Sequence, residues 1–212
     1  MLYETSGNTH YMDYYERALY NHILSTINPI QGGFVYFTPM RSGHYRVYSQ
    51  PQTSFWCCVG SGMENHARYG EMIYGHKGKN LYVNLFIPST LDWNGTMIEQ
   101  QTAFPEEEGT TLVVSPEMGK KAFAMHVRIP KWADKSLVRV TVNGEQQNLD
   151  IKDGYAVVNR TWKKGDKLHI AMPMHLYTIG LPDGSANYSF MYGPVVLASS
   201  LGKQQQDGMY AD

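Results

Sequence analysis

Apolar and polar positions follow one period in the first third of the chain and another in the rest, with the change near residue 76. Between Thr9 and about Ile27, apolar residues recur with helical spacing, which predicts a helix with one buried stripe. The stripe consists of Tyr11, Tyr15, Ala18, Leu19, His22, Ile23 and Ile27. Asn8 or Thr9 can cap the start of this helix, and the Asn28-Pro29 pair ends it.

A second helix is expected after an irregular stretch at residues 29–56. Residues 61–64 have the Ser-x-x-Glu pattern of a capping box, in which two side chains satisfy the free amides at a helix start. We therefore expect a helix from there to about Tyr74. The neighbouring residues Cys57 and Cys58 would then lie just before its N-terminus.

From residue 81 onward the period is two, which is typical of strands with one buried face. The alternating segments are 81–87, 123–129, 138–142, 155–158, 168–172, 188–192 and 195–198. The pair Asn143-Gly144 is the favoured two-residue hairpin turn, because both positions tolerate a positive φ. About eight short strands separated by turn residues predict an antiparallel β-sandwich. The fold is therefore expected to be mainly β with a helical N-terminal part, divided into residues 1–75 and 76–212.

Composition and charge exclude several classes of protein. The chain has 212 residues, of which 42% are hydrophobic and 17% charged, so it should fold. A formal net charge of −1, without clusters of Lys or Arg, argues against nucleic acid and membrane lipids as partners. No apolar run approaches the ~20 residues of a membrane span. The first residues do not resemble a signal peptide, and we expect the chain to be a segment of a longer protein. The sequence does not indicate whether that protein is exported or cytoplasmic.

The two cysteines of the chain, Cys57 and Cys58, are adjacent. A disulfide between neighbours strains the intervening peptide, so they do not indicate a disulfide scaffold. A position beside a helix N-terminus favours the thiolate, which is both a nucleophile and a zinc ligand. The alternative also stands, because free cysteines are often small buried side chains that only pack.

A zinc site needs about four ligands, and the two thiols supply half of that number. Glu64, His66 and Glu71 are nearby, but each is expected to face solvent or to pack rather than to bind metal. The other histidines do not cluster in the sequence. Of these, His126 and His169 fall on the polar faces of expected strands, where we expect them to be exposed.

Three segments follow one another in the first 62 residues: Asp-Tyr-Tyr-Glu-Arg-Ala-Leu-Tyr-Asn at 13–21, Gly-Phe-Val-Tyr-Phe-Thr-Pro at 33–39, and Phe-Trp-Cys-Cys-Val-Gly-Ser-Gly at 55–62. In order and spacing they resemble consecutive motifs of glycoside hydrolase families 127 and 146, the β-L-arabinofuranosidases. The strand-rich remainder resembles the C-terminal β-sandwich of those enzymes. The cysteine segment and the Glu-Arg-Ala-Leu-Tyr-Asn segment are fairly specific, whereas the sandwich is not.

The resemblance implies that the chain is the end of an (α/α)6 barrel followed by an antiparallel β-sandwich. It implies that Cys57 is the nucleophile of a retaining glycosidase and also binds zinc, and that Cys58 is a second zinc ligand. The reaction would pass through a glycosyl-cysteine intermediate. Tyr36 is expected to contact substrate, with a packed tyrosine as an equal alternative.

The chain also departs from the family pattern. The general acid/base glutamate and the Glu-x-Cys pair that completes the zinc site lie upstream of these motifs in the family. Residues 4–6 (Glu-Thr-Ser) mimic that pair, but they carry Ser in place of Cys and lie too close to Glu16. We therefore expect an intact parent that is active on an arabinose-containing glycan, and a fragment that is inactive alone and holds zinc incompletely or not at all.

Two other functions remain open. The first is a carbohydrate-binding or structural β-sandwich without catalysis, although Trp93, Trp132 and Trp162 are spread over separate strand ends and form no evident platform. The second is a stand-alone metal or redox protein that uses the cysteine pair. If the helices are cut from a barrel, their apolar stripe should cause self-association through the exposed helices, or disorder in the first ~60 residues.

Overall fold

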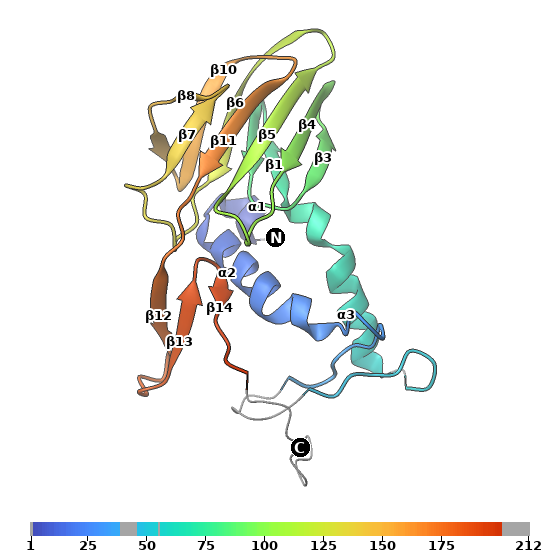
Figure 1. Ribbon diagram of the computed structural model, residues 1–212. Helices are drawn as coiled ribbons and strands as arrows, with labels where there is room; N and C mark the ends of the chain where they lie inside the picture. The colour runs from blue at the N-terminus through green and yellow to red at the C-terminus, as the bar shows by residue number, and fades with distance from the viewer. Residues whose placement is uncertain (1, 39–45, 55, 201–212) are drawn as a thin grey trace.

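The computed structural model describes residues 2–38, 46–54 and 56–200. Its helices all lie in the N-terminal third (Figure 1): α1 (Leu2–Ser6), α2 (His10–Ala18), the π-helical turn η1 (Leu19–Ile23), the 3₁₀ turn η2 (Leu24–Thr26), α3 (Cys57–Ala67) and the 3₁₀ turn η3 (Tyr69–Met72). The strands follow: β1 (Tyr74–Lys77), β2 (Asn80–Val83), β3 (Ser89–Asp92), β4 (Thr96–Gln101), β5 (Gly109–Pro116), β6 (Lys120–Arg128), β7 (Arg139–Val142), β8 (Glu145–Gln146), β9 (Asp150–Lys152), β10 (Tyr155–Lys163), β11 (Asp166–Ala171), β12 (Leu176–Gly180), β13 (Tyr188–Tyr192) and β14 (Val195–Val196).

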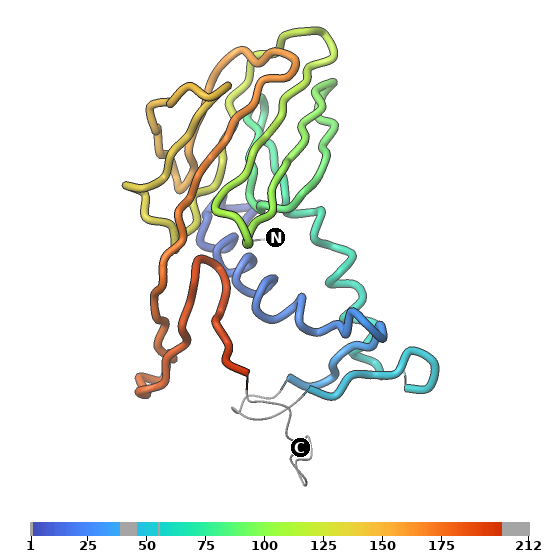
Figure 2. The backbone as a smooth tube through the Cα atoms, viewed as in Figure 1, coloured from blue at the N-terminus to red at the C-terminus, as the bar shows by residue number. Residues whose placement is uncertain are grey.

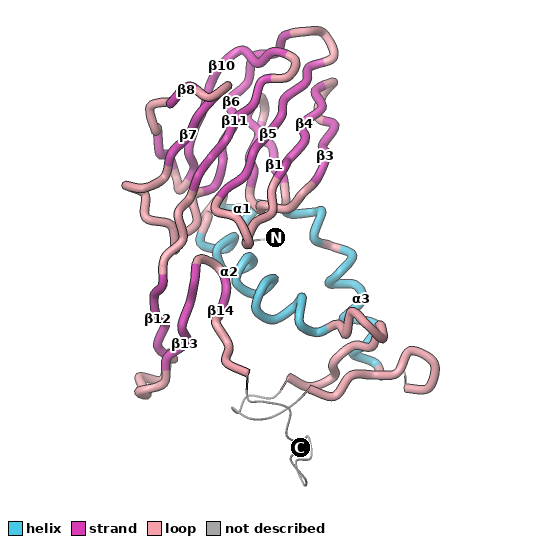
Figure 3. The backbone as a smooth tube through the Cα atoms, viewed as in Figure 1, coloured by secondary structure: helices cyan, strands magenta, loops and turns pink. Residues whose placement is uncertain are grey.

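Two sheets form the β-sandwich in the upper part of Figure 3, and the helices lie below it. One sheet has the strand order β1-β2-β6-β10-β9, and the other has the order β3-β4-β5-β11-β7-β8. Among the residues that the structure describes, the paired strands run antiparallel except β2 and β6, which are parallel. The expected purely antiparallel sandwich is thus corrected to a mixed one, because side chains alternate in the same way in both kinds of pairing.

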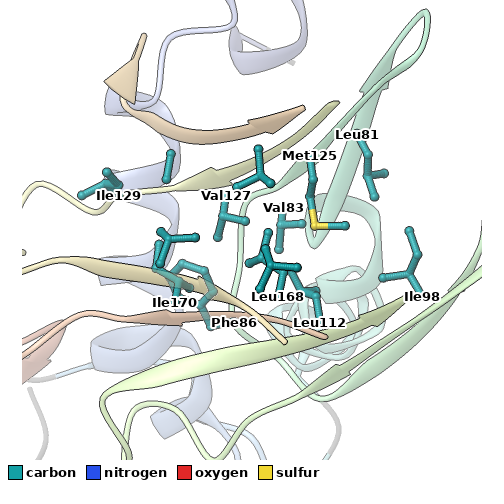
Figure 4. Packing of buried hydrophobic residues seen from close by; sticks show 14 of the residues in the cluster. Leu81, Val83, Phe86, Ile98, Leu112, Met125, Val127, Ile129, Leu168 and Ile170 are labelled. Atoms are coloured by element: carbon teal, nitrogen blue, oxygen red, sulfur yellow. The ribbon is translucent and has the colours of Figure 1, made fainter. Parts of the chain in front are cut away.

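The core of the sandwich fills the space between its two sheets. Figure 4 shows Leu81, Val83, Met125 and Val127 from one sheet facing Ile98, Leu112, Leu168 and Ile170 from the other. All eight side chains are buried. Six of them belong to the segments predicted from period-two alternation, whereas Ile98 and Leu112 lie in β4 and β5, outside those segments. Burial of one such side chain contributes about 1.5–3 kcal/mol to folding.

The turn between β7 and β8 has the expected conformation. Asn143 and Gly144 adopt φ values of 54° and 84°. Both are positive, as a two-residue hairpin loop of this type requires. The hairpin prediction from this pair is confirmed.

The buried side of α2 differs from the predicted stripe. Its buried residues are Met12 and Glu16, and Leu19 of η1 continues the same side. Tyr11, the first member of the predicted stripe, is exposed. The difference arises because a carboxylate, Glu16, faces the sandwich, and an apolar pattern does not reveal a buried ion pair.

The outer face of β6 is also buried, which corrects the expectation that His126 is exposed. Only 8% of His126 and 0% of Arg128 is accessible to solvent. The His126 ring stacks on Tyr82 with centroids 4.4 Å apart. By contrast, His169 is exposed as expected.

Helices α1 and α2 cover part of this outer face. Tyr3 of α1 bonds through its hydroxyl to the hydroxyl of Tyr155 at 2.6 Å and donates to Oδ1 of Asn84 at 2.9 Å. Arg128 donates from Nη1 to Oδ1 of Asp13 at 2.7 Å. Strand β6 is therefore buried on both sides from Phe123 to Arg128, although its sequence alternates.

A third sheet, β12-β13-β14, extends away from the sandwich. Figure 2 shows the chain running from β11 directly into β12 and then returning beside the helical part. Asn21 of η1 holds the returning segment, because its side-chain amide donates to the carbonyl of Pro194 and its oxygen accepts from the N–H of Val196. The three-stranded sheet is thus attached to η1, which directly follows α2.

The described residues therefore form a mainly β fold with few helices, and they do not by themselves build an (α/α)6 barrel. The expected division between residues 75 and 76 stays a prediction, and β1 runs across it. None of the helices in the described ranges is long and apolar enough to span a membrane.

Candidate active site

Cys57 and Cys58 are the first two residues of α3. The expected helix start at residues 61–64 is wrong, because Trp56, with φ −88° and ψ 156°, is the N-cap and makes no side-chain capping bond. The helix also ends earlier than expected, at Ala67. Both thiols therefore lie in the first turn, where main-chain N–H groups have no acceptor within the helix and favour negative charge.

Both cysteines are free and exposed, and their sulfur atoms are 3.8 Å apart. This excludes the interpretation that they are small buried side chains. The thiol of Cys57 also contacts the hydroxyl of Tyr36, with Sγ and Oη 3.9 Å apart. When the thiol is ionised, the hydroxyl can donate to the sulfur instead.

The surroundings of Cys57 lower its pKa. The hydrogen bond with Tyr36 contributes most, followed by the one with Cys58, and the main-chain N–H groups of the first turn act in the same direction. The same contact with Cys57 raises the pKa of the Tyr36 hydroxyl. The site therefore favours the nucleophilic form of the thiol and keeps the phenol protonated.

Tyr36 is held in place by aromatic neighbours. Its ring packs edge-on against Trp56 with centroids 6.0 Å apart and against Phe37 with centroids 4.5 Å apart. Trp56 directly precedes Cys57, so the residue at the N-cap of α3 also supports the tyrosine through its ring. Tyr36 is itself exposed, so its hydroxyl remains accessible beside the thiol.

The backbone before Tyr36 is fixed by a close crossing with Ser49. The N–H of Phe34 donates to Oγ of Ser49 at 2.9 Å, and the N–H of Ser49 donates to the carbonyl of Phe34 at 2.8 Å. A Cβ on Gly33 would lie 1.9 Å from the Ser49 carbonyl oxygen, so only glycine fits there. This crossing sets where the Tyr36 segment meets α3.

The other candidate ligands in α3 and η3 do not join the cysteines. His66 bonds through Nδ1 to the Tyr69 hydroxyl at 2.6 Å, and burial lowers its pKa. Glu64 is exposed, and Glu71 lies 3.9 Å from Arg68 at the surface. Within the described ranges, no group of three or more His, Cys, Asp or Glu side chains is placed to hold a metal ion.

The geometry of the two thiols nevertheless fits part of a zinc site. Two sulfur ligands at the usual Zn–S distance of about 2.3 Å in a tetrahedral site are about 3.8 Å apart. The sulfur atoms of Cys57 and Cys58 have this separation. The pair therefore matches two corners of the tetrahedron.

A buried charge cluster was missed by the sequence interpretation. Arg128 donates to Asp13 and Glu16, and it also donates from Nε to the carbonyl of Asn84 at 2.6 Å. Nε1 of Trp132 donates to the other oxygen of Glu16 at 3.0 Å. A charged residue at the end of a strand usually faces solvent. The role of Arg128 is therefore visible only in the folded structure, where α2 lies over it.

Comparisons with known proteins give the family. The model of the β-L-arabinofuranosidase GH127 catalytic domain matches residues 1–71, and the model of the GH127 middle domain matches residues 80–174. The chain belongs to glycoside hydrolase family 127. This agrees with the resemblance seen in residues 13–21, 33–39 and 55–62.

Solved structures of GH127 enzymes share the fold. A β-L-arabinofuranosidase from Geobacillus stearothermophilus T6 is 30% identical with a TM-score of 0.77, and 92% of this chain covers 33% of it. A protein described as a glycoside hydrolase is 26% identical with a TM-score of 0.78, and 92% of this chain covers 35% of it. A GH127 β-arabinofuranosidase is 28% identical with a TM-score of 0.77, and 92% of this chain covers 34% of it. The chain thus spans about a third of these GH127 structures, and no curated protein matches it.

Proposed function

We propose that this GH127 chain carries the nucleophile of a retaining β-L-arabinofuranosidase and that Cys57 is the attacking group. One observation supports this most strongly: an exposed thiol lies in the first turn of α3 with the Tyr36 hydroxyl on its sulfur. The helix N-terminus and the phenol both stabilise a thiolate. A thiolate that is open to solvent is also open to a sugar.

The proposed reaction has two displacements. In the first, Sγ of Cys57 attacks the anomeric carbon, and the C–S bond forms as the C–O bond to the leaving group breaks. The leaving oxygen takes a proton from a general acid, which we assign to a glutamate outside this chain. In the second, water attacks the anomeric carbon, gives up a proton to the same carboxylate and releases the thiolate. Two inversions retain the anomeric configuration.

We also propose that Cys57 and Cys58 hold zinc in the intact enzyme. The 3.8 Å between their sulfur atoms suits two ligands of one tetrahedral ion. Bound zinc would keep the thiols ionised at neutral pH. The two thiols supply two ligands, so the remaining ones are assigned to upstream residues of the parent, and the chain alone should hold zinc weakly or not at all.

The sugar would lie over Cys57 and beside Tyr36. The phenol is kept protonated by its contact with Cys57, so it can donate a hydrogen bond to a sugar oxygen. Two relatives are described as β-L-arabinofuranosidase and β-arabinofuranosidase, which supports an arabinose-containing glycan as substrate. Without a proton donor for the leaving group, the chain alone should not turn over substrate.

The helical part fits the end of a catalytic barrel. We assign residues 1–75, with α2 and α3, to the last helices of an (α/α)6 barrel and residues 76–212 to the β-sandwich that follows. The match of the GH127 catalytic-domain model to residues 1–71 supports this assignment. Self-association through the exposed sides of these helices is proposed for the isolated chain, in which Tyr14 and Leu24 are exposed.

The test is to trap the covalent intermediate in the full-length parent. The enzyme is mixed with p-nitrophenyl β-L-arabinofuranoside and quenched in acid, and its peptides are analysed by mass spectrometry. We expect one pentosyl group on the peptide that contains Cys57, and loss of both label and hydrolysis in Cys57→Ser. A pentosyl group on a carboxylate, or undiminished hydrolysis by Cys57→Ser, would overturn the proposal.

A further inference from the structure

A pocket of about 450 Å³ is lined by the loop between β6 and β7 and by the segment that joins β11 to β12. Small-molecule sites in proteins commonly have volumes of about 300–1,000 Å³. The lining side chains include Lys131, Trp132, Asp134, Leu137, Met174 and His175. They belong to neither α3 nor the Tyr36 segment, so this pocket is separate from the cysteine pair.

The ring of Trp132 is fixed in this pocket. Its Nε1 donates to Oε2 of Glu16 at 3.0 Å, and Glu16 is itself paired with Arg128. The ring is also stacked on Phe104, with centroids 6.0 Å apart and planes 18° apart. One face of the indole thus lies against Phe104, and the opposite face is the one available to a ligand. A ring that is held before binding loses little conformational entropy when a ligand packs on it.

Met174 is held as firmly as the indole. Its N–H donates to Oε1 of Glu108 at 2.9 Å, and the same oxygen is bonded to the hydroxyl of Tyr192 at 3.1 Å. A Cβ at Gly193 would lie 2.5 Å from Sδ of Met174, so the side chain packs closely on that turn. Together with Leu137, which is 48% exposed, Met174 adds apolar surface to that of the indole.

Three polar side chains line the same pocket and have unused hydrogen-bonding capacity. Ser136 donates through its hydroxyl and its N–H to Oδ1 of Asp134, at 2.7 and 2.9 Å. These bonds hold the pKa of Asp134 below its usual value, and His175 acts in the same direction, so the carboxylate is ionised at neutral pH. Within the ranges that the structure describes, Oδ2 of Asp134, the ammonium of Lys131 and the imidazole of His175 make no hydrogen bond.

An aromatic face beside charges of both signs selects the class of ligand. An anion would meet Asp134 and a cation would meet Lys131, so a neutral molecule is favoured over either. A purely apolar molecule would leave the polar groups without partners. A sugar ring presents C–H groups on its face and hydroxyls at its edge, and each hydroxyl can both donate and accept a hydrogen bond. This matches the lining of the pocket.

We propose that this pocket is a secondary binding site for one sugar residue of a neutral glycan, with the C–H face of the sugar on Trp132 and its hydroxyls bonded to Asp134, Lys131 and His175. The choice of arabinose rests on the proposed function, which gives the parent an arabinose-containing glycan as substrate. Binding here is non-covalent and does not use Cys57. A glycan chain held on the sandwich would have a raised effective concentration at the enzyme.

The test is an NMR titration of the ¹⁵N-labelled 212-residue chain with arabinotriose. The indole N–H signal of Trp132, identified by its loss in Trp132→Phe, should shift with a Kd on the order of 1 mM. The indole of Trp162 is buried and donates to the carbonyl of Phe123, so its signal should stay in place. No shift of the Trp132 signal at concentrations about ten times that Kd would overturn the proposal.

Variants of the polar side chains test the assigned contacts. Asp134→Asn keeps an acceptor for Ser136 but removes the charge, and Lys131→Ala removes the ammonium. Each should weaken the binding of arabinotriose about tenfold, as expected for the loss of a hydrogen bond to a charged group. The matched control is Lys135→Ala, which removes a charge from the same loop at a position that does not line the pocket and should bind as the wild type does. Circular dichroism checks that each variant is folded, and wild-type affinity in both folded pocket variants would overturn the proposal.

An acidic sugar separates a neutral ligand from a charged one. Digalacturonate should bind more weakly than arabinotriose, because its carboxylates meet Asp134, and tighter binding of digalacturonate would overturn the assignment to a neutral glycan. The outcome is independent of the chemistry at Cys57. A chain that does not bind arabinotriose, beside a parent that forms a pentosyl group on Cys57, would show that the secondary site alone is wrong. A chain that binds arabinotriose at Trp132, beside a parent that forms no such group, would support the site and count against the proposed function alone.

Discussion

The guanidinium of Arg128, at the end of β6, forms a buried ion pair with the carboxylate of Glu16 in α2, 112 residues away in the sequence. Neither side chain is reached by solvent to a significant extent. Burial raises the pKa of Glu16, and the charge of Arg128 opposes this shift. The pair joins the helical part to the sandwich, so the position of α2 depends on a residue outside the helices.

Removal of Arg128 should strongly destabilise the protein. Arg128→Met leaves two carboxylates, Asp13 and Glu16, without a countercharge, and the loss of one partner of a buried pair costs about 3–5 kcal/mol. The free energy of unfolding is measured by urea denaturation. The matched control is Arg68→Met, which removes the exposed pair with Glu71 and should cost at most about 1 kcal/mol. Equal effects of the two substitutions would contradict the conclusion that Arg128 holds the helical part against the sandwich.

Stability should depend on pH through His126. Burial lowers the pKa of His126, and Lys152 adds to this effect. The imidazole is therefore neutral in the folded state, whereas in the unfolded chain it takes up a proton below about pH 6.5. Its contribution to the free energy of unfolding is present above pH 6.5 and decreases as pH falls toward the folded pKa.

The substitution His126→Phe tests this pH dependence. It keeps a ring against Tyr82 and should reduce the loss of stability between pH 7 and pH 5, measured by urea denaturation at each pH. His169→Phe, which replaces an exposed imidazole, is the matched control for the loss of a histidine. An identical slope for wild type and His126→Phe would show that His126 is not responsible.

Gly33 should be required for the close crossing of the Tyr36 segment with Ser49. Gly33→Ala places a Cβ against the carbonyl oxygen of Ser49, so the crossing strands must separate. We expect a loss of about 1–3 kcal/mol in the free energy of unfolding. The control Gly60→Ala adds a methyl to open space in α3 and should be neutral or stabilising by up to about 1 kcal/mol. Equal stability of the two variants would contradict the close crossing.

The Tyr36 hydroxyl should control the reactivity of Cys57. Because its hydrogen bond lowers the pKa of Cys57, Tyr36→Phe should raise that pKa and slow alkylation by iodoacetamide at neutral pH. The rate is followed by peptide mass spectrometry as a function of pH. Tyr14→Phe removes an exposed hydroxyl on another helix and should have no effect. An unchanged pH profile in Tyr36→Phe would show that the contact has no influence on the thiol.

Several strands of the sandwich could be predicted from the sequence, because apolar residues alternate along β2, β6, β7, β10 and β11, whereas β3, β4 and β5 were not predicted. Leu168, Ile170 and their neighbours are buried as the alternation indicates. The hairpin at Asn143-Gly144 followed from backbone sterics alone. The parallel pairing of β2 with β6 could not be predicted, because side-chain alternation contains no information on strand direction.

The failures have physical causes as well. The helix start was misplaced because residues 61–64 look like a cap, whereas Trp56 caps α3 through its backbone conformation alone. His126 was expected to face solvent, but its ring stacks on Tyr82 of the neighbouring strand. The role of Arg128 was missed because its partners, Asp13 and Glu16, come from a helix far away in the sequence. The importance of Cys57 came from family motifs, and its contact with Tyr36, 21 residues away, required the folded backbone.

The most direct test of the account is zinc content and activity measured together, on this chain and on the full-length parent. We predict that the chain alone is nearly metal-free and inactive, that the parent holds one zinc, and that Cys57→Ser in the parent abolishes hydrolysis of p-nitrophenyl β-L-arabinofuranoside. Tight binding of one zinc by the isolated chain would contradict the shared site, and an active Cys57→Ser parent would contradict the assignment of Cys57 as nucleophile.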